Sequence, residues 1–182
     1  MSYLISAKKG NLLNEKSDFL VNPSNTKLIL GSGVSLAFKR KCGIKLQIGL
    51  DSILNKAVNN ELKQGDVVIT SSYDADNFKY ALHAAVMNYN QGVRGDNKKP
   101  KIDTIHKILY NIEKYLIAQA NETNRPTKVA IPLIGCGVGG LDKKEVLSLY
   151  KDFFMRDVEM ECNVVVYGYS ENDYNKILDI LG

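Results

Sequence analysis

The sequence lacks the patterns that mark secreted, membrane-spanning and zinc-binding proteins. It has no run of about 18 apolar residues, and residues 1–6 hold no basic segment followed by an apolar core. Its three cysteines, Cys42, Cys136 and Cys162, are far apart, odd in number and fit no metal-ligand spacing. We therefore expect reduced thiols, no metal, no cofactor, no membrane contact and a cytoplasmic location.

A large charge excess is also missing. The formal net charge is +4 over 182 residues, which favours an anionic partner slightly but is too small to imply nucleic acid by itself. With 45% hydrophobic and 24% charged residues, the chain can bury a substantial core. Because no linker or internal repeat interrupts it, we expect one domain over residues 1–182.

The chain is organised around residues 129–142, a short apolar run that leads into a glycine-rich turn and then a helical pattern over 143–154. This arrangement predicts a buried strand whose loop opens at the carboxyl end of a sheet, where open α/β folds bind ligands. Successive backbone N–H groups beside a helix amino end can cradle an anion, usually phosphate. The alternative is a tight strand-to-helix turn that binds nothing.

A second glycine cluster, residues 31–33, leads into a helical pattern over 34–41 and repeats this arrangement. Two anion cradles in one domain would suit a diphosphate. The basic residues 39–41 near the end of that helix are expected to complement the helix dipole and to face solvent.

Two asparagines follow the short apolar run 19–21. Because proline at position 23 prevents a simple continuation of a strand, we expect Asn22 and Asn25 to lie in a loop at the strand's carboxyl end. An amide there can donate to and accept from a ligand hydroxyl. Alternatively, both side chains only shape a turn.

The remaining pattern alternates strands and helices. We expect strands over 3–7, 67–70, 78–83 and 164–167, and helices over 51–62, 105–116 and 173–181. Residues 88–101 form a long polar segment whose basic side chains could contact phosphates or RNA, or simply face solvent. The alternation predicts an α/β fold with helices on both faces of a largely parallel sheet that is antiparallel in part.

Five motifs in order resemble the macro domain, and the resemblance covers most of the chain. They are residues 10–12, the string Val21-Asn22-Pro23-Ser24-Asn25, the glycine cluster 31–34, the segments 65–70 and 79–83, and residues 134–141. The family's second motif normally reads Val-Asn-Ala-Ala-Asn. Each motif is weak alone, but their common order and spacing are specific.

The resemblance implies a three-layer α/β/α sandwich with a mixed, largely parallel sheet that binds ADP-ribose at the strand ends. By analogy Asn25 contacts the distal ribose, Asn11 accepts from the adenine amino group and Tyr167 stacks on adenine. Tyr167 could instead be an ordinary residue at a sheet edge. The full set of expected ligand-binding residues is Asn11, Leu12, Asn22, Asn25, Gly31, Ser32, Gly33, Val34, Gly135, Cys136, Gly137, Val138, Gly139, Gly140, Leu141 and Tyr167.

The departures from the family leave catalysis open. Ser35 stands where one branch of macro-domain hydrolases carries an acidic residue, and Gly139 stands where another carries an aspartate. Asn25 and Asp142 are therefore our candidate catalytic residues, although Asp142 also suits a helix N-cap. His83 is expected to be a hydrogen-bonded structural residue.

Three functions follow. The first is binding of free or protein-linked ADP-ribose. The second is weak hydrolysis of ADP-ribose 1''-phosphate or of ADP-ribosylated protein side chains, by attack of a positioned water. The third is binding of single-stranded RNA through the basic segment 92–101.

Overall fold

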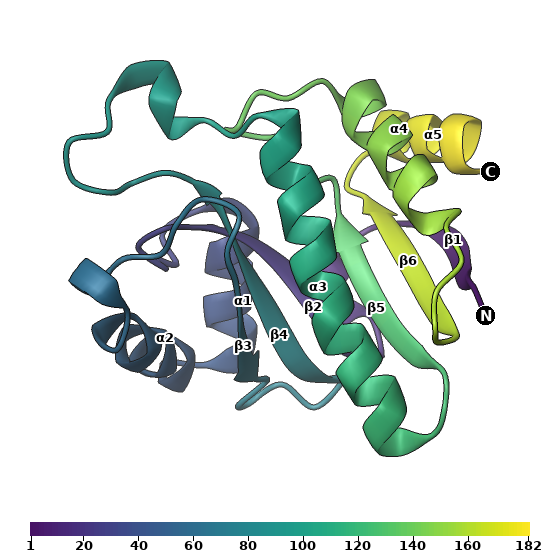
Figure 1. The fold of residues 1–182 in the computed structure, drawn as a ribbon, viewed down its shortest axis with the longest axis horizontal. Helices are drawn as coiled ribbons and strands as arrows, with labels where there is room; N and C mark the ends of the chain where they lie inside the picture. The colour runs from purple at the N-terminus through teal and green to yellow at the C-terminus, as the bar shows by residue number, and fades with distance from the viewer.

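The computed structural model describes residues 1–182 and contains a six-stranded sheet in the order β1-β6-β5-β2-β4-β3 (Figure 1). Only β3 and β4 pair antiparallel; every other neighbouring pair is parallel. The strands are β1 (Tyr3–Lys9), β2 (Ser17–Asn25), β3 (Val67–Ser71), β4 (Phe78–Met87), β5 (Thr127–Pro132) and β6 (Cys162–Gly168). The predicted mixed, largely parallel sheet is confirmed.

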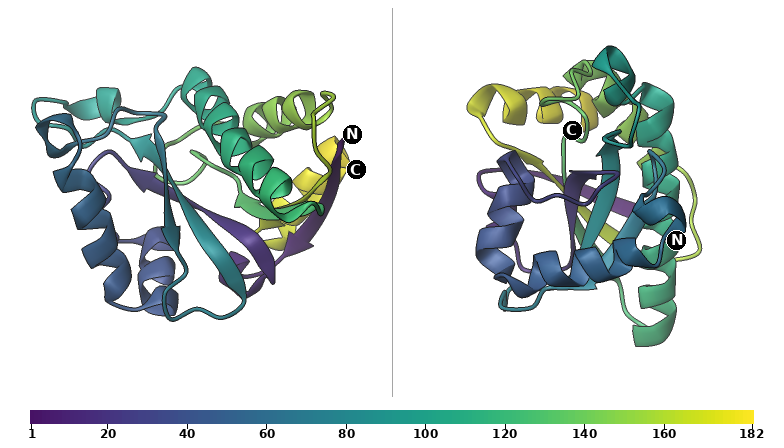
Figure 2. Two further views of the ribbon diagram at one scale, coloured as in Figure 1. Left: turned by 60° about the horizontal axis from the view of Figure 1, so that its bottom comes forward. Right: turned by 90° about the vertical axis from the view of Figure 1, so that its left-hand side faces the viewer.

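Helices cover both faces of the sheet and give three layers (Figure 2). One face packs against α1 (Gly33–Cys42) and α2 (Lys45–Asn55). The other packs against α3 (Ile102–Thr123), α4 (Lys143–Phe154) and α5 (Glu171–Leu181). No helix is both long enough and apolar enough to cross a bilayer.

Strand β2 lies in the middle of the sheet and is buried on both sides. Phe19 and Val21 enter the core beneath α3 and α4, whereas Leu20 enters the core beneath α1 and α2. Successive side chains of a strand point to opposite faces, so an unbroken apolar run is what a strand between two helical layers requires.

The expected helix over 51–62 is wrong in position. Helix α2 spans Lys45–Asn55 and is followed by a single 3-10 turn at Val58–Asn60. Leu46 and Leu50, one helical turn apart, are fully buried against the sheet, whereas Ile44 and Ile48 are exposed. Residues 44–50, whose apolar side chains alternate as in a strand, therefore lie at the start of a helix that buries only Leu46 and Leu50.

The expected loop at residues 22–25 is also wrong, because these residues are the end of β2. Asn22 and Pro23 pair with His83 and Ala84 of β4, and the register shifts between Ser24 and Asn25. On its other side β2 pairs with β5 only at Phe19 and Leu20. A proline is tolerated there because the strand is bonded to one neighbour only.

Beyond Leu20, β2 and β5 are no longer paired with each other, which leaves a crevice between their carboxyl ends. The chain leaves the carboxyl end of β2 toward α1 on one face and the carboxyl end of β5 toward α4 on the other. Neighbouring parallel strands whose connections leave in opposite directions define the point where open α/β sheets bind ligands.

Candidate functional site

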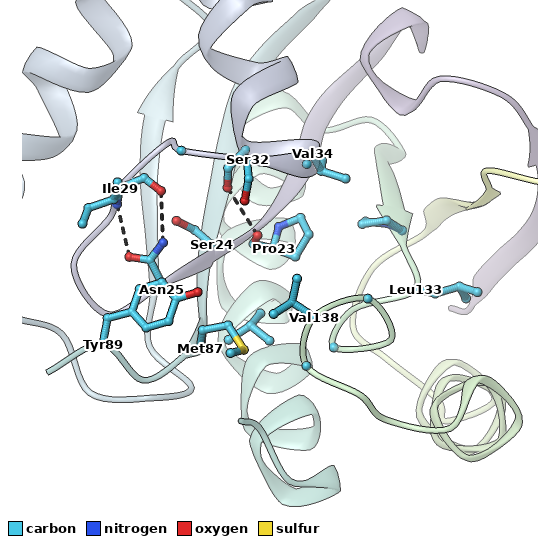
Figure 3. Close-up of a pocket in the computed structure, with 18 residues that line it drawn as sticks. Pro23, Ser24, Asn25, Ile29, Ser32, Val34, Met87, Tyr89, Leu133 and Val138 are labelled. Atoms are coloured by element: carbon cyan, nitrogen blue, oxygen red, sulfur yellow. Dashed lines mark hydrogen bonds between the residues drawn. The ribbon is translucent and has the colours of Figure 1, made fainter. Parts of the chain in front are cut away.

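A cleft of about 310 Å³ lies at the carboxyl ends of β2 and β5 and is lined by both glycine loops (Figure 3). Its walls are Pro23, Ser24, Asn25, Ile29, Gly31, Ser32, Gly33, Val34, Ser35, Val86, Met87, Tyr89, Pro132, Leu133, Gly135, Gly137, Val138 and Gly139. The structure thus brings together two loops that are about a hundred residues apart in the sequence.

The first glycine loop presents the amino end of α1 to the cleft. Ser32 is the N-cap residue, but its side chain makes no capping hydrogen bond. The N–H groups of Gly33, Val34 and Ser35 belong to the first turn and have no carbonyl acceptor within the helix. These three donors and the helix dipole are available to an anion.

Some N–H groups of the second loop form hydrogen bonds within the loop, and others remain free at the cleft. The N–H groups of Cys136, Gly140 and Leu141 donate to carbonyls of Leu133, Gly137 and Gly135, which closes the turn. Those of Gly137, Val138 and Gly139 make no hydrogen bond within the chain. All three residues line the cleft. The loop therefore offers a second set of free donors opposite the first.

Cys136, Gly140 and Leu141 support this loop and do not line the cleft, so their contact with a ligand stays a prediction. Cys136 is half-buried, and burial raises the pKa of its thiol to about 11. Leu141 packs on the core beneath α3 and α4. The hydroxyl of Tyr150, in α4, accepts from Ile134 N at 3.1 Å and donates to Pro132 O at 2.6 Å, which anchors the base of the loop.

Gly139 is needed because the second loop folds back on itself. A Cβ at this position would lie 2.6 Å from the carbonyl oxygen of Gly135 and 3.0 Å from Cγ of Pro100. Only glycine permits so close an approach of two backbone segments. Pro100 belongs to the basic segment 92–101, so that segment packs against the second loop.

Lys99 is a cation near the second loop. Its Nζ lies 3.9 Å from where a Cβ on Gly140 would stand, and it forms an exposed 3.6 Å ion pair with Asp96. The sequence identified residues 92–101 as basic but could not place them beside the glycine loop.

Asn25 lines the cleft, but its side chain is already occupied in shaping the chain (Figure 3). Its Oδ1 accepts from the N–H groups of Lys27 and Ile29 at 3.0 and 3.2 Å, and its Nδ2 donates to Ile29 O at 3.0 Å. These bonds hold the segment that leads to the first glycine loop. A contact with the distal ribose stays a prediction.

Asn22 lies beneath the cleft in a buried polar chain and does not line it. The Ser35 hydroxyl donates to Asn22 Oδ1 at 3.0 Å, and Asn22 Nδ2 lies 3.0 Å from His83 Nδ1. His83 Nε2 lies 2.9 Å from the Thr70 hydroxyl. Because an amide nitrogen can only donate, His83 Nδ1 accepts and Nε2 carries the proton.

His83 is accordingly a neutral structural residue, as the sequence predicted. It is fully buried, and burial lowers the pKa of its imidazole to about 3. No charged partner is needed because both ring nitrogens are hydrogen-bonded. Its neutral ring connects β4 to Asn22 and thereby to Ser35 at the start of α1.

Asp142 and Asn11 act as caps. Asp142 is exposed and outside the cleft lining, and its Oδ1 accepts from Lys144 N at 2.8 Å at the amino end of α4. Asn11 Oδ1 accepts from Leu13 N at 3.0 Å and begins a 3-10 turn, while Leu12 is buried in the core beneath α1 and α2. The candidate catalytic role of Asp142 has no geometric support.

Tyr167 is buried near the end of β6, and its hydroxyl donates to Glu15. Glu15 also accepts from Lys8 at 2.9 Å and Lys128 at 2.7 Å. Although burial would raise the pKa of Glu15, the hydrogen bonds from Lys128, Tyr167 and Lys8 lower it to about 2. The ring does not line the cleft, so its stacking on adenine stays a prediction.

Tyr169, two residues further on, is 87% exposed just beyond the carboxyl end of β6. Its ring is open to solvent at the carboxyl edge of the sheet, although it does not line the cleft. The sequence analysis did not select it, although Ser170, a residue suited to a helix N-cap, could have indicated that the strand ends before it.

The lining of the cleft contains no carboxylate, imidazole, ammonium or guanidinium group. Its only titratable side chain is Tyr89. The cleft therefore presents backbone donors, neutral polar groups and apolar side chains to a ligand. The apolar wall formed by Ile29, Val86 and Met87 was not expected, because its residues carry no motif. No group of three His, Cys, Asp or Glu side chains is arranged to hold a metal ion.

Comparison with protein families gives a match to the family described as Macro domain over residues 21–150. An uncharacterized protein of Sulfolobus acidocaldarius is 27% identical over 94% of this chain and 88% of its own length. An uncharacterized protein of Aquifex aeolicus is 28% identical over 87% of this chain and 84% of its own.

Solved structures with the same fold include macrodomains. The Oceanobacillus iheyensis macrodomain with ADP superposes with a TM-score of 0.80 at 22% identity, covering 97% of this chain and 89% of that one. The Trypanosoma brucei macrodomain in complex with ADP-ribose gives a TM-score of 0.73 at 18% identity, covering 98% of this chain and 69% of that one.

Proposed function

This chain belongs to the macro domain family, and we propose that it binds ADP-ribose in the cleft between its two glycine loops. In this proposal the free N–H groups of both loops hold the diphosphate. The distal ribose lies beside Asn25, and the adenine lies toward the carboxyl end of β6.

The observation that carries the proposal is the convergence of two sets of unpaired backbone donors on one cavity. Gly33, Val34 and Ser35 supply one set and Gly137, Val138 and Gly139 the other. Two adjacent phosphates spread their charge over several oxygens, and each set can serve one of them. Lys99, beside the second loop, adds positive potential.

The related folds support the same ligand class. The Oceanobacillus iheyensis macrodomain is known with ADP, and the Trypanosoma brucei macrodomain with ADP-ribose. At 22% and 18% identity these structures show the shared fold but not the ligand of this chain. The proposed ligand therefore depends on the free N–H groups of this cleft.

We propose that the cleft binds its ligand without hydrolysing it. Hydrolysis needs a positioned water and usually a base, and no carboxylate, imidazole or amine lines the cavity. Asp142 caps α4, and the Asn25 amide is occupied by backbone partners. The chain would then recognise free or protein-linked ADP-ribose and release it unchanged.

Isothermal titration calorimetry with ADP-ribose, ADP and a single-stranded oligoadenylate tests the proposal. We expect saturable binding of ADP-ribose and ADP with a stoichiometry near one, and weak, salt-sensitive binding of the oligonucleotide. The same protein should release neither phosphate from ADP-ribose 1''-phosphate nor ADP-ribose from a modified protein. Tight oligonucleotide binding without ADP-ribose binding would refute the proposal in favour of RNA, and turnover would refute the non-catalytic part.

A further inference from the structure

Ser24 is the penultimate residue of β2 and one of the residues that line the cleft (Figure 3), and its buried hydroxyl has no hydrogen-bond partner. The residue is only 3% exposed, and Oγ makes no hydrogen bond to the chain. A buried hydroxyl without a partner lowers the stability of the folded state, because it loses its bonds to water and gains none. Such a group calls for a functional explanation.

The other unpaired buried atoms of the molecule do not raise the same question. They are Asn77 Oδ1, Asn90 Oδ1 and Gln119 Nε2. Asn77 and Asn90 each use the other half of the amide, donating at 2.8 Å to backbone carbonyls. None of the three residues lines the cleft. Ser24 has a single polar side-chain atom, and that atom is unused.

The neighbouring polar side chains of the cleft differ from Ser24. Asn25 is occupied by Lys27 and Ile29, and the Ser35 hydroxyl donates to Asn22. Ser32 and Tyr89 are exposed and can bond to water. The Ser24 hydroxyl is therefore the one buried side-chain group of the cleft that lacks any partner.

The chemistry of the site indicates which part of a ligand it would meet. The N–H groups that suit phosphate oxygens belong to the two glycine loops, whereas Ser24 lies on β2 next to Asn25. A serine hydroxyl both donates and accepts, which complements another hydroxyl. We propose that Ser24 Oγ binds a hydroxyl of the ligand's distal sugar and so distinguishes ADP-ribose from ADP. This inference rests on the proposed function.

The test compares two ligands with two variants by calorimetry. Ser24→Ala should weaken ADP-ribose binding about 3- to 10-fold, the range for one net hydrogen bond, and should leave ADP binding unchanged. Ser72→Ala is the matched control, because Ser72 is also a buried serine but does not line the cleft, and its hydroxyl donates to Ala75 O at 2.9 Å. That variant should change neither affinity.

Thermal unfolding of the ligand-free proteins is a second measurement, in which the two variants should change Tm in opposite directions. Ser24→Ala should raise Tm because it removes an unpaired buried hydroxyl, whereas Ser72→Ala should lower Tm because it breaks a hydrogen bond. A lowered Tm in Ser24→Ala would show that the hydroxyl has a structural partner and would overturn the inference.

The outcomes separate this inference from the proposed function. Equal weakening of ADP and ADP-ribose by Ser24→Ala, or no change in either, would overturn the sugar contact while leaving ADP-ribose binding intact. Failure of the unsubstituted protein to bind either ligand would overturn the proposed function and, with it, the role of Ser24.

Discussion

Replacing Gly137 by valine should strongly weaken ligand binding while leaving the fold intact. A Cβ at Gly137 would have no atom within 4 Å, and its φ lies outside the left-handed range. The substitution therefore adds no strain or clash to the free protein. The free energy of unfolding should change by less than about 1 kcal/mol, with a small gain from reduced freedom of the unfolded chain.

The valine side chain would instead occupy the cavity. Gly137 lines the cleft beside the free N–H groups of Val138 and Gly139. A hydrogen bond to a charged group is worth about 1.5–3 kcal/mol, so displacing the diphosphate from one or two donors should cost about 2–4 kcal/mol of binding free energy. Affinity for ADP-ribose should fall about 30- to 700-fold.

Calorimetry and thermal unfolding on Gly137→Ala and Gly137→Val together check this reasoning. Alanine should give a smaller loss of affinity than valine, and both variants should keep a Tm close to that of the unsubstituted protein. Gly33→Val is a poorer test, because Gly33 has a φ of +55° and a side chain there strains the backbone. Retained affinity in Gly137→Val would refute the contact between the second loop and the anion.

Two further predictions concern the buried imidazole of His83 and the adenine of the ligand. Burial lowers the pKa of His83 to about 3, from an ordinary value of 6.5, so the unfolded chain binds the proton more readily than the folded one. Stability should therefore fall as pH decreases below 6.5, by up to about 1.4 kcal/mol per pH unit. Urea unfolding between pH 7 and 5 should show this slope, and His83→Gln should lack it despite a lower stability at pH 7; an unchanged slope would contradict a neutral buried imidazole. Tyr169→Ala should weaken ADP-ribose binding because stacking of a base on an aromatic ring is worth about 1–3 kcal/mol. Tyr167→Phe, which keeps the ring and loses the bond to Glu15, should change stability more than affinity; calorimetry showing the reverse pattern would return the stacking role to Tyr167.

Much of the fold could be read from local pattern. The strand-to-helix transitions at the two glycine loops, the antiparallel pair β3 and β4, and the amphipathic α3 all follow from short-range periodicity. Helix α2 was expected at 51–62 instead of Lys45–Asn55 because the apolar residues of 44–50 also alternate as in a strand, and only packing on the sheet decides between the two periods.

The cleft was predictable from the sequence where backbone groups of glycine loops line it. Glycine is the residue that lets main-chain donors approach an anion, so the sequence itself located the two loops. Side-chain roles were less predictable, because each depends on competing partners that are distant in sequence. Asn22 bonds to His83 and Tyr167 bonds to Glu15.

The sequence alone determined that two glycine loops each precede a helix, which is the local arrangement that an anion cradle requires. The tertiary structure decided that the two cradles face one another, because β2 and β5 are neighbours whose chains depart to opposite layers. It also decided which polar groups remain free for a ligand. Each hydrogen bond that a residue at the cleft makes within the fold leaves one donor or acceptor fewer for a ligand. Local sequence does not record those long-range pairings.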